Sequence, residues 1–327
     1  MAVTLDNKLV VGISSRALFD SEYEHSIYEE QGLQAYLAYQ REHEQDILKP
    51  GTAFPLIRAL HKLNDGDEQL VEIIIMSKNS ADTSLRIFNS IQHYGLDISR
   101  AALVGGNKIA PYLSAFRTGL FLSANEEDVQ EAIDAGVAAG LICSHDGLNI
   151  SPDEEINQIR IAFDGDAVIF SDESEKIFKS QGLEAFEEHE RLNARKPLPE
   201  GPFANLLATI SKVQKKFPTD NMPIRTALVT ARNAPAHERV IRTLMAWGVR
   251  IDEAFFLGGV QKSDFLKAFG AHIFFDDQDT HLSSSSKYVP SGKVPYYSDS
   301  QINEVVRTRE EQKRAAQEQT EQQAAAE

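Results

Sequence analysis

The feature that most constrains the fold of this 327-residue chain is an internal repeat. Gln31-Gly32-Leu33 recurs as Gln181-Gly182-Leu183 at a spacing of 150 residues, and Gly105-Gly106 recurs as Gly258-Gly259 at a spacing of 153. A three-residue insertion in the second copy accounts for the difference in spacing. Such a repeat indicates two copies of one structural unit, so both halves of the chain are expected to fold alike.

Each copy alternates short apolar runs with segments of helical periodicity. The runs expected as strands are 9–13, 71–76, 102–104 and 120–122 in the first copy, and 159–163, 226–229, 254–257 and 272–275 in the second. Strands that alternate with helices predict an α/β fold with a mainly parallel sheet. Ligands of such sheets bind beyond the carboxyl ends of the strands. The long segments 22–69 and 172–223 predict small helical insertions or caps.

The repeat also predicts the division of the chain into domains. Residues 1–143 and 156–299 are expected as two domains, each long enough to bury a core. The polar, turn-rich stretch 144–155 is the expected linker between them. Residues 300–327 are expected to be a polar helix or a disordered tail.

Charge and composition exclude several classes of protein. The formal net charge of −16 argues against a nucleic-acid polymer as partner, because phosphate backbones are bound through clustered Lys and Arg. No apolar run approaches the roughly 20 residues of a membrane helix, and residues 1–8 lack the pattern of a secretory signal. The single cysteine, Cys143, excludes an intrachain disulfide. We therefore expect a cytoplasmic protein without a membrane partner, and the sequence leaves its oligomeric state open, with a homo-oligomer among the options.

Polar side chains follow each expected strand of the second copy. A pair such as Asp164 and Asp166 can share one hard cation while one oxygen stays free to attack. Adjacent carboxylates after a buried run are costly unless they are paired or bind a metal. Each signal alone is weak, since Asp-x-Asp triplets are usually turns and a lone threonine is usually a helix N-cap. The full set is Asp164 and Asp166, Thr230, Lys262, and Asp276 and Asp277.

This order of groups resembles the haloacid dehalogenase superfamily and, more closely, the cytosolic 5′-nucleotidase I family. The stretches that carry the resemblance are 163–175, 228–232, 247–248 and 272–278 in the second copy, and 14–20, 51–55 and 105–107 in the first. At Ala167-Val168 the chain departs from the wider superfamily, where Gly-Thr is usual, but the nucleotidase I family shares that departure. The resemblance extends to about residue 299 and implies two duplicated haloacid dehalogenase-like domains with small helical insertions.

The resemblance implies a role for each group of the set. Asp164 would attack phosphorus and become an aspartyl phosphate, and Asp166 would protonate the leaving oxygen and then activate water. Thr230 would hold the phosphoryl oxygens, and Lys262 would offset negative charge. Mg²⁺ would be bound by Asp164, Asp276 and the backbone carbonyl of Asp166, with Asp277 supporting the metal or Lys262.

The implied function is Mg²⁺-dependent hydrolysis of nucleoside 5′-monophosphates, AMP first among them. Two alternatives remain open at this point. The same groups could serve another small phosphomonoester such as a sugar phosphate, because they address only phosphate and metal. The chain could also be a nucleotide sensor that binds without turnover, although the complete set of acids in the second copy argues against this.

The first copy lacks the groups needed for catalysis. The alignment pairs Asp164 with Ser14, Asp166 with Arg16, Lys262 with Ile109, Asp276 with Ser123 and Asp277 with Ala124. Only Thr230 keeps an equivalent hydroxyl, at Ser77. We expect this copy to be a packing partner or a lid rather than a phosphatase.

A second hypothesis gives the first copy an anion pocket. Its candidate residues are Ser14, Arg16, Ser77, Lys78, Gly105 and Gly106. Such a pocket could bind an effector nucleotide or part of the substrate, and the resemblance implies activation by nucleotides such as ADP or ATP. Weaker candidates are His189 and Glu190 in the expected cap of the second copy, while His281 lacks metal-ligand spacing.

Overall fold

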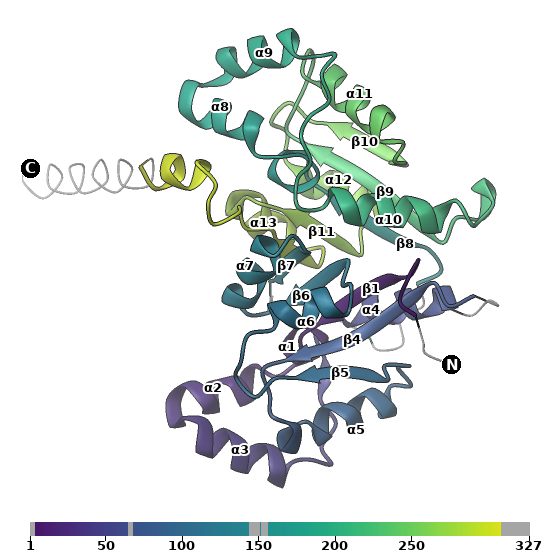
Figure 1. Ribbon diagram of the computed structural model, residues 1–327, viewed down its shortest axis with the longest axis vertical. Coiled ribbons are helices and arrows are strands. Elements are labelled where there is room, and N and C mark those ends of the chain that lie inside the picture. Colours follow the sequence, from purple (N-terminus) through teal and green to yellow (C-terminus); the bar gives the residue numbers. More distant parts are fainter. Residues whose placement is uncertain (1–3, 65–67, 144–150, 152–155, 309–327) are drawn as a thin grey trace, which may run out of the picture.

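The computed structural model describes residues 4–64, 68–143, 151 and 156–308, and its centre is one large sheet (Figure 1). Within these residues ten strands are joined in the order β10-β9-β8-β11-β12-β7-β6-β1-β4-β5. The first half contains β1 (Leu9–Ile13), β4 (Val71–Ser77), β5 (Arg100–Leu103), β6 (Leu120–Ser123) and β7 (Ala138–Ile142). The second half contains β8 (Ile159–Phe163), β9 (Ile224–Thr230), β10 (Glu253–Phe256), β11 (Ile273–Asp276) and β12 (Ser291–Lys293).

The two halves of the sheet have the same order of connection. Each places its first strand in the middle, its second and third strands on one side, and its fourth and fifth on the other. All pairs are parallel except β7 with β12, where Gly292 faces Ile142 and Lys293 faces Leu141. The predicted α/β fold with a mainly parallel sheet is confirmed. All eight predicted strands are present with ends shifted by at most two residues, whereas β7 and β12 were not predicted.

Helices follow the strands along most of the chain. In the first half they are α1 (Ser15–Leu18), α4 (Phe54–His61), α5 (Leu85–His93), α6 (Ala110–Ala115) and α7 (Glu126–Asp134). In the second half they are α10 (Ala204–Gln214), α11 (His237–Trp247), α12 (Lys262–Phe269) and α13 (Asp279–Ser285), after a helical turn at Gly165–Ile169. A separate pair of short strands, β2 (Phe19–Asp20) and β3 (Lys49–Pro50), joins the start of the first insertion to its end.

The predicted insertions form one helical hairpin in each half. They are α2 (Glu22–Gln31) with α3 (Leu33–Glu42), and α8 (Glu173–Gln181) with α9 (Leu183–Leu192). Gly32 and Gly182 separate the helices with φ of 83° and 88°, a region that glycine enters without steric cost. Figure 1 shows the two hairpins projecting at opposite ends of the sheet. We call α8 and α9 the cap of the second half.

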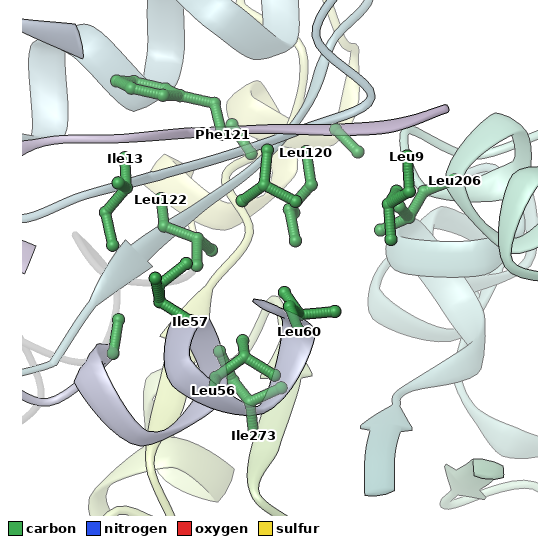
Figure 2. Packing of buried hydrophobic residues seen from close by; sticks show 14 of the residues in the cluster. Leu9, Ile13, Leu56, Ile57, Leu60, Leu120, Phe121, Leu122, Leu206 and Ile273 are labelled. Atoms are coloured by element: carbon green, nitrogen blue, oxygen red, sulfur yellow. The ribbon is translucent and has the colours of Figure 1, made fainter. Parts of the chain in front are cut away.

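One apolar core extends across both halves. Helix α10 of the second half contacts β1 of the first, and α4 of the first half contacts β8 of the second. Figure 2 shows Leu206 of α10 beside Leu9 of β1, and both side chains are at most 2% exposed. Burial of each such side chain contributes about 1.5–3 kcal/mol. The shared core fixes the halves against each other and gives the strand ends of the second half a firm base.

Some sequence-based expectations fall on residues that the structure does not describe. The predicted linker 144–155, apart from Ser151, and the tail from residue 309 onward lie outside the described residues, while residues 302–308 are helical. Among the helices that are described, none combines the length and the apolar character required to cross a bilayer.

Candidate active site

Three predicted site residues meet at one edge of the sheet. Asp164 follows β8, while Thr230 ends β9 and Asp276 ends β11, and these three strands are neighbours in the sheet. Because the strands are parallel, their carboxyl ends lie together. The backbone N–H of Asp164 donates to the carbonyl of Phe275 over 2.8 Å, which ties the two strand ends to each other. All three site residues are buried, with at most 4% of their surface exposed.

Lys262, at the start of α12, joins two of the acids. Its Nζ lies 2.8 Å from Oδ1 of Asp164 and 2.7 Å from Oδ2 of Asp276. Burial raises the pKa of Asp164 to about 7, with Lys262 opposing and Asp276 adding to the effect. Burial would also raise the pKa of Asp276, but its pairing with Lys262 and His281 outweighs burial and lowers it. The two carboxyl groups thus share one cation, and Asp164 is the one that holds a proton more readily.

A group of three side chains at this point could hold a metal ion. Ligand atoms of Asp164, Asp276 and His281 all lie within 4.8 Å of one another. Nδ1 of His281 is 3.1 Å from Oδ2 of Asp276. The spacing of residues in the sequence gave no reason to include His281. In the structure, the first turn of α13 brings this side chain back to Asp276 at the end of β11. Two buried carboxylates beside one lysine leave excess negative charge, which suits a divalent cation.

Asp166 faces a different partner. Its Oδ1 and Oδ2 lie 2.6 Å and 2.7 Å from NH2 and Nε of Arg232, and its side chain is not part of the three-residue group. It sits in the helical turn Gly165–Ile169, where Ala167 has a φ of 62°. A left-handed residue other than glycine costs about 1–2 kcal/mol. Surrounding contacts must hold this turn, and with it the position of Asp166.

Thr230 and Asp277 border the same site. Oγ1 of Thr230 accepts the backbone N–H of Arg232 over 3.2 Å. Oδ2 of Asp277 accepts the hydroxyl of Tyr296, and its Oδ1 is buried without a hydrogen-bond partner among the described residues. Burial, with Asp276 and Asp164 adding to it, raises the pKa of Asp277 well above its usual range. Asp277 is therefore beside the acid cluster, but the structure shows no contact between it and Lys262.

Comparison with known proteins identifies the family. The family model described as 5′-nucleotidase matches residues 1–301. The chain belongs to the 5′-nucleotidase family. Cytosolic 5′-nucleotidase 1B of Homo sapiens is 41% identical over 293 residues, which are 86% of this chain and 48% of the human protein. The chain thus spans about half the length of that curated relative.

A solved structure named "Structure of Pnkp1/Rnl/Hen1 complex" aligns with 89% of this chain and 97% of its own, at a TM-score of 0.31 and 10% identity. A similarity this low carries no argument about the fold or the function. The sequence-based resemblance to the nucleotidases is confirmed at the level of the family.

In this 5′-nucleotidase family member, the first half keeps the backbone of the site without its acids. The N–H of Ser14 donates to the carbonyl of Leu122 over 2.8 Å, as the N–H of Asp164 does to Phe275. Oγ of Ser14 accepts the N–H of Ala17 over 3.2 Å and so caps α1. Within the described residues, no second cluster of three metal-binding side chains occurs in this half.

The two positively charged side chains of the predicted anion pocket in the first half already pair with acidic residues. Arg16 pairs with Glu22 over 3.0 Å, and Lys78 pairs with Asp128 over 2.7 Å. Nε of Arg16, however, is buried without a hydrogen-bond partner among the described residues. The remaining pocket candidates are Ser77, whose Oγ lies 3.3 Å from that of Ser15, and Gly105 and Gly106, with φ of 56° and 86°.

Sequence reasoning missed two neighbours of the site. Arg232 lies in the stretch 228–232 that carries the family resemblance, but the sequence does not predict its pairing with Asp166. Tyr296, which donates to Asp277, also receives a hydrogen bond from Lys179 over 2.8 Å. A comparison of the two copies carries a signal for Arg232, because the equivalent residue of the first half is Asn79, which has no charge. No such signal marks Tyr296.

Proposed function

We propose that this chain hydrolyses nucleoside 5′-monophosphates, AMP first among them, through an aspartyl phosphate on Asp164. The observation that carries the proposal is the buried cluster in which Asp164 and Asp276 share Lys262 at the ends of neighbouring strands. Membership of the 5′-nucleotidase family and the name of the human relative support the substrate class. That relative's name also supports a cytoplasmic location.

The reaction would proceed in two transfers of the phosphoryl group. Oδ2 of Asp164, the oxygen not paired with Lys262, attacks phosphorus while the bond from phosphorus to the 5′ oxygen breaks. A proton from Asp166 goes to that leaving oxygen, which releases the nucleoside. Asp166 then takes a proton from water, whose oxygen attacks phosphorus and frees the carboxylate of Asp164. Thr230 and Lys262 would hold the phosphoryl oxygens and offset their charge throughout.

The donors around Asp164 fit a hard divalent cation. Asp164 and Asp276 offer carboxylate oxygens, the ligands that Mg²⁺ prefers, and the backbone carbonyl of Asp166 is the proposed third ligand. His281 is better suited to orient Asp276 from beside it, since imidazole is a poor Mg²⁺ ligand. The buried, unpartnered Oδ1 of Asp277 marks a further oxygen that could support the site. When bound, Mg²⁺ would stabilise the negative charge on the phosphoryl group.

Substrate entry would require the cap to move. Asp164 and Asp276 are 4% and 0% exposed, so a nucleotide could not reach them in this arrangement of the chain. We propose that α8 and α9 swing away to admit the nucleotide and close over it before the first transfer.

We also propose that the chain consists of two haloacid dehalogenase-like domains, residues 1–143 and 156–299, which arose by duplication. The identical order of strands in the two halves supports this, as do the helical hairpins with glycine between their helices. The first domain would be non-catalytic, since it lacks every acid of the site. Its Arg16 leaves room for a secondary role in binding an effector nucleotide such as ADP or ATP.

Phosphate release from a panel of phosphomonoesters tests the proposal. The panel contains AMP, IMP, GMP, CMP, UMP and several sugar phosphates, each with Mg²⁺ and with EDTA, and with Asp164→Asn as the control variant. Release that is led by a nucleotide, requires metal and is lost in Asp164→Asn supports the proposal. Release led by sugar phosphates would overturn the substrate class. No release, with ADP or ATP present, would favour a non-catalytic nucleotide sensor.

A further inference from the structure

A buried row of charges links Asp166 to the cap. Arg232 pairs with Asp166 through one side of its guanidinium and with Glu190 of α9 through NH1. Glu190 in turn lies 2.9 Å from NH1 of Arg239 in α11. Arg232 and Arg239 are each 3% exposed, and Glu190 is 1% exposed. Charges this deeply buried are costly unless each is paired, so the row is an ordered part of the structure.

Each member of the row is held from a different element. Arg232 follows β9, and the Cζ of its guanidinium lies 5.2 Å from the centre of the Phe186 ring in α9. Glu190 also accepts a hydrogen bond from Ser174 of α8 over 2.8 Å. Burial would raise the pKa of Glu190, but its pairs with Arg232 and Arg239 outweigh burial and lower it. Residues of both cap helices therefore take part in the row of charges that ends at Asp166.

The first half shows which part of this row the fold itself requires. Arg86, the equivalent of Arg239, keeps the same hydrogen bond from Nε to a backbone carbonyl, over 2.9 Å to Asp46. It also keeps a buried carboxylate partner, Glu24, at 2.6 Å. Arg239 makes the matching bond to the carbonyl of Lys196 over 3.0 Å. A buried arginine at this position thus belongs to the shared architecture.

Arg232 and Glu190, in contrast to Arg239, are not shared by the two halves. Their equivalents in the first half are Asn79 and Gln40, both uncharged, in the half where Arg16 replaces the acid. The carboxylate that pairs with the shared arginine moves from α9 to α2, where Glu24 is the equivalent of Ser174. Arg232 and Glu190 therefore occur together with Asp166, and the fold forms without them.

We propose that Arg232 is the positioning residue of Asp166, and that Glu190 holds Arg232 so that the cap sets the place of the acid. This inference rests on the proposed function. The planar fork of arginine fixes the plane of a carboxylate through two parallel hydrogen bonds. Each oxygen of Asp166 keeps a second lone pair, so the carboxyl group can exchange a proton with the leaving oxygen or with water. Closure of the cap would thereby bring the acid into register with the bound nucleotide.

A change of leaving group separates this role from a merely structural one. AMP leaves as an alkoxide, which needs a proton, whereas an AMP analogue with sulfur as the bridging 5′ atom leaves as a thiolate, which does not. Rapid mixing with excess enzyme measures the first transfer alone, through nucleoside release from AMP and thiol release from the analogue. If Arg232 serves the acid, its loss must slow release from AMP far more than release from the analogue.

Two variants make the test robust against misfolding. Arg232→Lys keeps the charge and loses the fork. The triple variant Arg232→Asn, Glu190→Gln, Ser174→Glu copies the first half, so that Arg239 keeps a carboxylate partner. We expect AMP release to fall about 100-fold in the triple variant and thiol release to fall less than about tenfold. Arg232→Lys should fall between wild type and the triple variant on AMP.

Matched controls complete the design. Arg86→Lys changes a buried arginine of the first half and should slow both substrates by the same factor. Glu190→Gln alone should shift the ratio of the two rates in the same direction as Arg232→Lys. An equal loss on both substrates in the Arg232 variants would overturn the proposal, and an unchanged ratio in Glu190→Gln would overturn the part assigned to the cap. Wild type that releases nothing from AMP would instead refute the proposed function itself.

Discussion

Replacement of Gly201 by alanine tests how firmly the turn that carries Asp166 is held. Gly201 donates its N–H to the carbonyl of Ile169 over 2.9 Å, directly beside the turn that carries Asp166. A Cβ at this position would lie 2.2 Å from the carbonyl oxygen of Phe170 and 2.6 Å from that of Val168. Both neighbours are backbone atoms, so no side chain can rotate to relieve the contact.

The size of the effect follows from these distances. Ordinary contact of a Cβ begins at 3.4 Å, so the two segments must separate by about 1 Å. Overpacking of this kind costs about 1–3 kcal/mol of stability. A catalytic group misplaced by about 1 Å can lose about 100-fold in rate. We expect Gly201→Ala to lower kcat for AMP by about that factor while the protein still folds.

Gly51→Ala is the matched control, since Gly51 is the equivalent residue of the first half. Its Cβ would lie 2.9 Å from the backbone N and C of Phe19, and no acid lies on the adjoining turn. It should lower the urea midpoint of unfolding yet leave kcat near that of wild type. Equal loss of kcat in both variants, or a wild-type kcat in Gly201→Ala, would refute the view that this contact places Asp166.

Three further predictions concern charge and pH. Since burial raises the pKa of Asp164 to about 7, protons should compete with Mg²⁺ for this carboxylate below that pH. The apparent Mg²⁺ affinity should then fall about tenfold for each pH unit below 7, as measured by calorimetric titration at several pH values. An affinity that does not change with pH would contradict this prediction. Burial and the nearby Arg160 lower the pKa of His272, so the unfolded chain binds the proton more readily and stability should fall as the pH drops through about 6.5. His272→Asn keeps an acceptor for the N–H of Arg160 and should lessen that fall in urea unfolding, whereas an identical pH profile would exclude His272 as its source. Arg16→Ala should weaken activation by ADP or the apparent affinity for AMP, measured by phosphate release; if both stayed unchanged, the effector hypothesis for the first half would be wrong.

The strands that the sequence predicts are those with a run of large apolar side chains. The two strands of the large sheet that it missed lack such a run. β7 reads Ala-Ala-Gly-Leu-Ile, and β12 reads Ser-Gly-Lys, which has no intrinsic preference for a strand. β12 forms because β11 and β7 lie on either side of it, so its existence depends on tertiary contacts.

In the site, too, some features could be predicted from the sequence and others could not. Asp164, Thr230 and Asp276 could be placed together from the sequence, because each comes at the carboxyl end of an expected strand. The direction of a side chain could not be read in this way. Asp166 follows Asp164 by two residues, yet it faces Arg232, which comes after β9, rather than the group of three possible metal ligands, and the spacing in the sequence does not reveal that.

The antiparallel junction of β7 and β12 has a consequence for the life of the protein in solution. Without residues 1–143, β12 would present unpaired N–H and C=O groups, and exposed edges of this kind recruit strands from other chains. The ring of Phe275, which adjoins Asp276, would also lose its cover, because it lies so close to Gly140 that a Cβ there would be 2.7 Å away. Residues 1–143 thus cover a strand edge and an aromatic ring of the second half that would otherwise be open to other chains.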